Sequence, residues 1–349
     1  MRNSILITFI LAFVITFATT PFVKKFAFKI GAVDVPKDNR RMHKKPTARL
    51  GGLAIFFGFI ISVLLFAKTD KELWGLALGC LIIVILGIFD DIYALSAKFK
   101  LVFQILAALC PVLAGVRIEF IRVPSFLVEY GYIGLGWFAI PITLIWILAI
   151  TNATNLLDGL DGLACGVSSI SALTLLCIAI IVGESEVAFI TSALAGACFG
   201  FLPYNFNPAK LFMGDTGSMF LGFVLGAASV QGLFKGYAVV SLAAPILVLG
   251  LPIFDTTSAV LRRLKNHQPI LSPDRGHLHH KLIDAGFSQK RAVTTIYALC
   301  LILCVVAVAL IATGAVSLWV LALVLLGFVL FLWLTPRIIE TITDKDENK

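Results

Sequence analysis

The chain has 349 residues, of which 59% are hydrophobic and only 14% charged, with a net charge of +8 and a mean hydropathy of +0.99. A soluble domain carries about a quarter charged residues, so this composition excludes an ordinary soluble protein and indicates that lipid is the solvent. The basic residues do not lie on a soluble domain, and this argues against a nucleic-acid-binding protein.

Eleven apolar segments are predicted, most of them near the ~17–25 residues that cross a bilayer as a helix. They are Ile5–Phe22, Leu50–Ala67, Leu73–Phe89, Leu101–Val116, Gly134–Thr151, Leu163–Val182, Val187–Tyr204, Met219–Leu233, Ala238–Ser258, Ala292–Ala312 and Val316–Leu334. We interpret the first as an uncleaved span, because it is long for a signal peptide and no clear A-x-A site follows it. The predicted fold class is therefore all-α, with a single polytopic transmembrane domain over residues 1–349.

Lysine and arginine are distributed unevenly between the loops that join these segments. One alternating set of loops holds 22 of the 28 lysines and arginines. That set comprises Val23–Arg49, Asp90–Lys100, Asn152–Gly162, Asn205–Ser218, Ala259–Arg291 and the tail after Leu334. Because such residues accumulate in cytoplasmic loops, we expect a multi-pass plasma-membrane protein with its N-terminus outside and its C-terminus in the cytoplasm.

Polar clusters interrupt the apolar sequence, and all of them fall on the predicted cytoplasmic side. The segments are "FDDIY" with Asp90 and Asp91, "NATNLLDGLD" with Asn152, Asn155, Asp158 and Asp161, "FMGDTGS" with Asp215, Thr216 and Ser218, "IFDTTS" with Asp255, and "DRGHLHHKL" with Asp274, Arg275, His277, His279 and His280. Acids at membrane depth are costly unless they face a polar cavity or a cation. The spacing of three in the second segment places Asn155, Asp158 and Asp161 on one face of a helical turn.

A set of acids that repel one another is stabilised by a divalent metal and by basic groups. Oxygen ligands favour Mg²⁺, or alternatively Mn²⁺, over zinc. Lys98, Lys100, Arg275 and the histidines supply the basic groups. Metal, acids and cations around a wet pocket are typical of a phosphoryl-transfer site on the cytoplasmic face.

Each cluster taken alone has a plainer interpretation. Asp90 and Asp91 are compatible with a helix-end pair, and "GDTGS" with a helix cap. Asp255 is compatible with an ion pair at a helix end, and the histidines with a surface loop. These interpretations do not explain why all the clusters fall on one side of the membrane.

The motifs "NLLDGLDGLACG", "FMGDTGS" and "DRGHLHH" resemble those of the polyprenyl-phosphate N-acetylhexosamine-1-phosphate transferases, and the likeness covers nearly the whole chain. The spacing His277-Leu278-His279-His280 resembles the WecA/TagO branch, which uses UDP-GlcNAc. The branch that acts on UDP-MurNAc-pentapeptide has three consecutive histidines there. The resemblance implies transfer of GlcNAc-1-phosphate to undecaprenyl phosphate, with release of UMP, as the first membrane step of a surface polysaccharide or teichoic acid pathway.

The resemblance also assigns roles to residues. It implies Asp215 as a metal ligand, with Asp90 beside it, and Asp90 and Asp91 as a catalytic acidic pair. It places Asn155, Asp158 and Asp161 on the nucleotide side, with Asp158 among the catalytic acids. The residues proposed to contact phosphate, sugar or uracil are Lys45, Arg49, Phe212, Arg275, His277, His279 and His280, of which the last two are also catalytic candidates. Lys98 and Lys100, the basic residues beside Asp90 and Asp91, are further candidates for binding the substrate.

Three alternatives stay open at this point. The same chemistry with another UDP-N-acetylhexosamine or with UDP-MurNAc-pentapeptide fits most of the motifs. A secondary transporter also places carboxylates in the membrane, although it predicts acids near the midplane and repeated halves. A membrane scaffold explains none of the acids. Pairing into a homodimer is left open by the sequence.

The uneven distribution of basic residues yields a prediction about orientation. A tag placed after Lys349 should be protected from protease added outside intact cells, because the tail belongs to the basic set of loops. A tag placed before Met1 should be cleaved in the same cells. The opposite pattern of protection would place the polar clusters outside the cell and contradict the predicted orientation.

Overall fold

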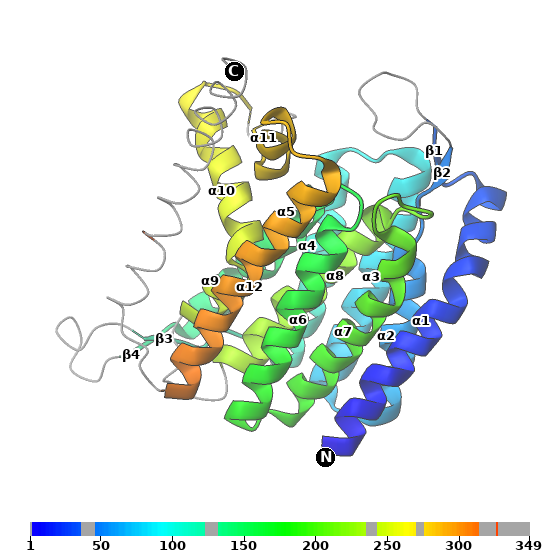
Figure 1. Cartoon of the computed structure of the whole chain (residues 1–349). Helices are drawn as coiled ribbons and strands as arrows, with labels where there is room; N and C mark the ends of the chain where they lie inside the picture. The colour runs from blue at the N-terminus through cyan, green and yellow to red at the C-terminus, as the bar shows by residue number, and fades with distance from the viewer. Residues whose placement is uncertain are drawn as a thin grey trace.

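The computed structural model of the chain describes residues 2–35, 46–122, 132–234, 243–269, 276–313 and the single residue 326. Long helices run alongside one another as a bundle (Figure 1). The helices are α1 (Arg2–Ile30), α2 (Gly52–Phe66), α3 (Lys71–Tyr93), α4 (Ala97–Ala114), the 3₁₀ turn η1 (Gly136–Phe138), α5 (Ala139–Leu157), α6 (Leu163–Val182), α7 (Ser185–Asn205), α8 (Gly214–Ser229), the π-helical turn η2 (Val230–Phe234), α9 (Ala243–Val248), α10 (Gly250–Lys265), α11 (Leu278–Asp284) and α12 (Gln289–Thr313).

Helix α8 lies at the centre of the bundle. It packs against α2, α3, α5, α6 and α7. Every residue of α8 except Asp215 is buried, so a lipid-facing stripe is absent from this helix. Its many small residues allow this, because small side chains let neighbouring backbones approach closely inside a membrane. The first turn of α8 is therefore held from several sides at once.

Seven described helices are long and apolar enough to cross a membrane. They are α1, α3, α4, η1 with α5, α6, α7 and α12, while α2 is a shorter apolar helix. The prediction of a helical, multi-pass membrane protein is confirmed at this level. The count of eleven spans stays a prediction, and the last predicted segment, Val316–Leu334, lies outside the described residues apart from Leu326.

The ninth predicted span, Ala238–Ser258, is not one continuous helix in its described part. Helix α9 ends at Val248 and α10 begins at Gly250, with a break at Leu249. Pro252 lacks the N–H that would bond to the carbonyl of Val248 four residues earlier. Ser171 Oγ on α6 donates to that carbonyl instead, at 2.9 Å. The proline thus opens the helix, and a neighbouring hydroxyl satisfies the freed group.

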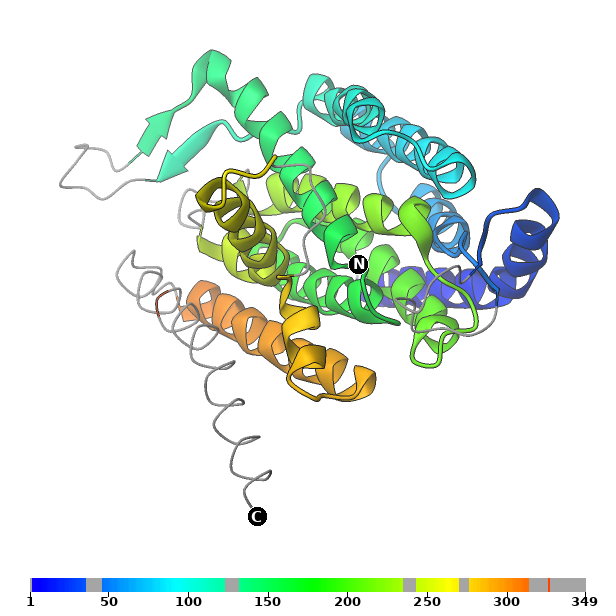
Figure 2. The ribbon, with the colours of Figure 1, turned by 90° about the horizontal axis from the view of Figure 1, so that it is seen from above.

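Two short antiparallel hairpins were not predicted from the sequence. In the first, β1 (Val33–Asp34) pairs with β2 (Thr47–Ala48), and Val33 lies opposite Ala48. In the second, β3 (Phe120–Arg122) pairs with β4 (Tyr132–Gly134), and Ile121 lies opposite Ile133. Figure 2 shows the second hairpin projecting sideways from the bundle. Two or three residues per strand are too few to produce a readable alternating pattern.

The packing of α3 on α8 yields a prediction about stability. A Cβ on Gly87 would lie 2.3 Å from Thr216 Cα, which is backbone and cannot move aside alone. Gly87→Ala should therefore destabilise the protein by about 1–3 kcal/mol, despite the better helix propensity of alanine. Thermal unfolding in detergent measures the effect.

Gly250→Ala is the matched control, because among the described residues a Cβ there meets just the terminal methyl of Leu303, at 3.3 Å. It should unfold close to the wild-type temperature. Equal unfolding temperatures for the two variants would contradict the close contact between α3 and α8.

Candidate active site

The described polar clusters lie at one end of the bundle. This is the end at which α3, α5, α7 and α10 finish and α4, α6, α8 and α12 begin, beside α11 and the β1–β2 hairpin (Figure 1). Segments that are more than a hundred residues apart in the chain therefore contribute to one site. The predicted gathering of the acids on one side of the bundle holds for the residues the structure describes.

The centre of this site is a pair of carboxylates that share one ammonium group. Lys100 Nζ lies 2.8 Å from Asp90 Oδ2 and 3.5 Å from Asp215 Oδ2. Asn155 Nδ2 donates to Asp215 Oδ1 at 2.7 Å and to Ser218 Oγ at 2.8 Å. Four helices, α3, α4, α5 and α8, thus each supply at least one member of the cluster.

The turn between α3 and α4 brings Lys100 back to Asp90. Ala94 ends α3 in the left-handed conformation, with φ of 51°. Asp90 Oδ1 accepts a hydrogen bond from the Leu95 amide at 2.7 Å, and Ser96 then caps α4. A tight turn with a side-chain acceptor fixes the direction of the second helix. Lys100, one turn into α4, consequently faces the end of α3.

Asp91 has a different environment from Asp90. Its Oδ1 accepts from the Asp215 amide at 2.9 Å, and its Oδ2 accepts from the Thr216 amide at 3.1 Å. Thr216 Oγ1 also donates to Oδ2, at 2.7 Å. Arg49 Nη2 lies 3.6 Å from Oδ1, and the Asp91 side chain has no exposed surface. Asp91 therefore satisfies the free amides in the first turn of α8.

The segment around Arg49 is bound to the segment that leads into α8. Phe212 N donates to Ala48 O at 2.9 Å, and Gly51 N donates to Phe212 O at 3.0 Å. Arg49 and Phe212 face each other in an isolated parallel bridge. Both side chains are half-exposed at the edge of the cluster, where a ligand can reach them. This position is compatible with the predicted phosphate contact of Arg49 and the predicted stacking of Phe212.

Asp158 follows the last residue of α5 and lies near the carboxylates of Asp215 and Asp91. Burial, together with the negative charges of Asp215 and Asp91, raises the pKa of Asp158 to about 8. These surroundings therefore favour the protonated form of the carboxyl more than water does. A cation bound nearby would favour its ionised form.

Asp161 holds the loop after α5 against two other segments. Its Oδ2 accepts from Asn207 Nδ2 and from the Ala209 amide, both at 3.0 Å. Asn207 Nδ2 also donates to Gln289 Oε1 at 2.6 Å, and Tyr297 donates its hydroxyl hydrogen bond to Gly162 O. Sequence reasoning missed Asn207, Gln289 and Tyr297, because a single amide or phenol side chain belongs to no recognisable motif.

The histidine segment packs onto the same loop. A Cβ on Gly159 would lie 2.3 Å from His279 Nε2, so the imidazole ring rests directly on the glycine. Burial, together with the charge of the neighbouring His280, lowers the pKa of His279 to about 4. The His279 and His280 ring centroids are 4.3 Å apart. His279 is thus a neutral ring, and its Nδ1 has no hydrogen-bond partner among the described residues.

Asp255 fixes the start of this segment from α10. His277 Nδ1 lies 2.8 Å from Asp255 Oδ2, and the Leu278 amide donates to Asp255 Oδ1, also at 2.8 Å. One carboxylate thus holds both the ring of His277 and the first turn of α11. The plainer interpretation of Asp255 as an ion-pair partner at the helix end does not include this link to the histidines.

Some predicted residues are not brought into the cluster. Lys98 is exposed on α4, and no contact joins it to the acids among the described residues. Asn152 lies one turn before Asn155, and its Nδ2 donates to Gln104 Oε1 at 2.9 Å and to Leu148 O at 2.8 Å. Lys45, Asp274 and Arg275 lie outside the described residues.

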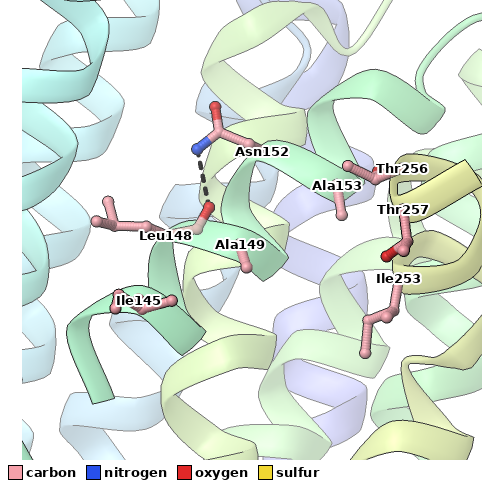
Figure 3. Close-up of a pocket in the computed structure, with 8 residues that line it drawn as sticks. All are labelled: Ile145, Leu148, Ala149, Asn152, Ala153, Ile253, Thr256 and Thr257. Carbon is pink, nitrogen blue, oxygen red and sulfur yellow. Dashed lines mark hydrogen bonds between the residues drawn. The ribbon is translucent and has the colours of Figure 1, made fainter. Parts of the chain in front are cut away.

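An apolar groove of about 360 Å³ adjoins the polar cluster between α5 and α10. Its lining residues are Ile145, Leu148, Ala149, Asn152 and Ala153 on α5 and Ile253, Thr256 and Thr257 on α10 (Figure 3). Asn152 is one helical turn from Asn155, which holds Asp215. A ligand with an apolar chain in this groove would therefore have its polar end near the carboxylates.

The carboxylates suit a hard divalent cation. Asp90 and Asp215 both direct an oxygen toward the ammonium group of Lys100, so carboxylate oxygens from two helices converge on one positive charge. No group of three or more histidines, cysteines or acids arranged to hold a metal occurs among the described residues. Mg²⁺ usually takes one or two carboxylates and completes its shell with water and substrate phosphates. The donor set fits that pattern.

Comparison with known proteins points in one direction. The model of Glycosyl transferase family 4 matches residues 73–233. A probable undecaprenyl-phosphate N-acetylglucosaminyl 1-phosphate transferase of Bacillus subtilis is 41% identical over 99% of this chain and 96% of its own length. A decaprenyl-phosphate N-acetylglucosaminephosphotransferase of Mycolicibacterium smegmatis is 37% identical, over 82% and 77%. A phospho-N-acetylmuramoyl-pentapeptide-transferase of Caldicellulosiruptor bescii is 31% identical, over 88% and 96%.

The packing of the histidine segment yields a prediction about turnover. His279→Ala and His280→Ala should each slow release of UMP from a UDP-sugar by roughly 30- to 1000-fold, the loss expected when a group that contacts the reacting phosphates is removed. Lys281→Ala, on the exposed side of α11, is the control and should retain near-normal rates. Near-normal rates in both histidine variants would remove this segment from the site.

Proposed function

Because the chain belongs to glycosyl transferase family 4, we propose that it transfers GlcNAc-1-phosphate from UDP-GlcNAc to undecaprenyl phosphate. An oxygen of the lipid phosphate attacks the β-phosphorus of UDP-GlcNAc. The bond between that phosphorus and the bridging oxygen breaks, and UMP leaves. The product is undecaprenyl-pyrophosphoryl-GlcNAc, which would prime a cell-surface polysaccharide or teichoic acid.

The observation that carries this proposal is the cluster of Asp90, Lys100, Asn155 and Asp215 beside an apolar groove. A reaction between a lipid phosphate and a nucleotide sugar needs both halves at one place. The polar half must neutralise several phosphate charges, and the apolar half must accept an isoprenoid chain. A secondary transporter would place such acids near the membrane midplane instead.

The basic side chains would neutralise the phosphates. Lys100 is 22% exposed and Arg49 35% exposed, so both ammonium and guanidinium groups can turn toward a ligand. Positive groups that are already in place stabilise charge as it develops during phosphoryl transfer. Asp90 Oδ2, which lies beside Lys100, is the oxygen we expect to orient or deprotonate the lipid phosphate.

The groove between α5 and α10 would direct the lipid. Five of its eight lining side chains are apolar (Ile145, Leu148, Ala149, Ala153 and Ile253), which suits an isoprenoid chain entering from the bilayer (Figure 3). The amide of Asn152 lies at its lining, one turn from Asn155. A lipid phosphate at the end of this groove where Asn152 lies would meet Asp90 and Lys100. The nucleotide sugar would approach from the end of the bundle where the polar clusters lie.

We assign Asp215 and Asp90 as ligands of Mg²⁺, with Mn²⁺ as the alternative. When bound, such an ion withdraws charge from the phosphates and holds them in line for transfer. Asn155 keeps Asp215 pointed toward the cluster, through a hydrogen bond of 2.7 Å. The loop from Asp158 to Asp161, His277, His279 and His280 would face the nucleotide sugar, with the site opening to the cytoplasm.

The sugar is chosen on the spacing of the histidines. His277-Leu278-His279-His280 differs from three consecutive histidines, and the relatives with more than 35% identity are named for N-acetylglucosamine. The relatives named for the N-acetylmuramoyl-pentapeptide substrate are near 31%. That substrate, or another UDP-N-acetylhexosamine, is the alternative with the same chemistry.

A reconstituted assay tests the proposal. Purified protein is mixed with undecaprenyl phosphate, Mg²⁺ and one UDP-sugar at a time, and UMP and the lipid product are measured. We expect turnover of UDP-GlcNAc and none of UDP-MurNAc-pentapeptide. EDTA should abolish turnover, Mg²⁺ or Mn²⁺ should restore it, and Asp215→Asn should slow it by roughly 30- to 1000-fold, because a metal ligand is lost.

Each part of the proposal fails separately in this assay. Full activity in EDTA would refute the metal assignment without changing the reaction. Turnover of the pentapeptide substrate alone would move the chain to the alternative substrate. Transport of a solute without any release of UMP would refute the transferase.

A further inference from the structure

Asp91 is the second acid of the Asp90–Asp91 pair, yet its surroundings differ from those of a group that reacts with substrate. Both of its oxygens accept hydrogen bonds from the first turn of α8, at 2.7–3.1 Å. Two of the three donors are backbone amides, which cannot turn away. Asp90 Oδ2, by contrast, is held by the flexible and partly exposed Lys100. Asp90 can exchange its partner for a ligand, and Asp91 cannot do so without opening α8.

The sequence of α8 requires a cap from elsewhere in the chain. The residue before the helix is Met213, whose side chain makes no capping hydrogen bond. Helix N-termini are usually capped by an oxygen of a neighbouring side chain, because the first N–H groups have no partner within the helix. Asp91 supplies both oxygens from α3, where its negative charge also opposes the positive end of the α8 dipole.

Gly214 makes this approach possible. It has φ of 73°, and a Cβ at this position would lie 2.4 Å from Asp91 Oδ2 and 2.5 Å from Arg49 O. A larger residue would push the carboxylate away from the amides it caps. Gly87, one turn before Asp91 on α3, likewise meets the backbone of Thr216. Because Gly87 on α3 and Gly214 on α8 both lack a Cβ, the two helices pack closely here, and Asp91 can reach the first amides of α8.

We propose that Asp91 is a positioning residue, which fixes the first turn of α8 and thereby the direction of the Asp215 carboxylate, and that Asp90 alone of the pair faces the reacting groups. The inference rests on the proposed function only in taking Asp215 as a cation ligand. Asp91 Oδ1 bonds to the amide of Asp215 itself, so a displaced Asp91 moves the residue that binds the cation.

Mn²⁺ binding without turnover separates positioning from catalysis. The protein in detergent is titrated with Mn²⁺ alone, and free Mn²⁺ is followed by electron paramagnetic resonance. Asp91→Asn keeps the shape but turns an NH₂ group against an N–H donor of α8. We expect Mn²⁺ to bind about 10-fold more weakly or worse, the scale of one lost hydrogen bond to a charged group. Unchanged Mn²⁺ affinity with abolished turnover would make Asp91 a reacting group and overturn the proposal.

A second pair of variants decides the question if Asp91→Asn does not fold. Thr216→Val removes one donor to Asp91 and keeps the shape, and Thr216→Ser keeps the hydroxyl. The valine variant should bind Mn²⁺ several-fold more weakly, and the serine variant should match the wild type, as expected when one hydrogen bond is lost or retained. Equal affinities for the two variants would overturn the proposal.

Hydrogen–deuterium exchange gives a readout that does not depend on a metal. Exchange in the peptide containing Asp215 and Thr216 should be faster in Asp91→Asn and Thr216→Val than in wild type and Thr216→Ser. Unchanged exchange in the first two variants would overturn the proposal. If wild-type protein bound no Mn²⁺, the metal assignment of the proposed function would fail, and the exchange comparison alone would decide the role of Asp91.

Discussion

The cap that Asp91 places on the N-terminus of α8 is the constraint on which the site depends. Its two oxygens accept three hydrogen bonds from Asp215 and Thr216, at 2.7–3.1 Å, and no part of its side chain is exposed. Because α8 packs against five helices, its first turn lies within reach of residues from several of them. Lys100 and Asn155 contact Asp215 in that turn, and Asp90 joins them through Lys100.

The balance of charge in the site follows from this arrangement. Asp90 and Asp215 come from helices that would otherwise hold two carboxylates close together in a poorly solvated place, where repulsion is strong. Lys100 lies between them and Asn155 donates to one of them, so the pair remains stable without substrate. Lys100 is also partly exposed. Lys100, which offsets the charge of the two acids, is thus also a group that the phosphates would contact.

Helices α10, α11 and α12 complete the site beside the loop that follows α5. Helix α11 lays His279 on Gly159, and α12 reaches the same loop through Tyr297 and, by way of Asn207, through Gln289. Asp255 on α10 holds the histidine segment, while the neighbouring face of α10 forms the apolar groove with α5. One helix therefore joins the proposed lipid path to the proposed sugar contacts. A substitution that shifts α10 would therefore alter both the groove and the histidine segment.

The sequence by itself determined the membrane class, most helix positions and the residues that gather at one end, because apolar length and costly charges are local signals. It did not determine the break at Leu249, because a proline alone does not say how a helix will adjust. Pro252 leaves the carbonyl of Val248 without its helical donor, and the hydroxyl of Ser171 on α6 donates to that carbonyl instead. Nor did it separate Asp90 from Asp91, which are adjacent in sequence. Consecutive residues on a helix point about 100° apart, so only the packing of α3 decided that one carboxylate faces Lys100 and the other caps α8.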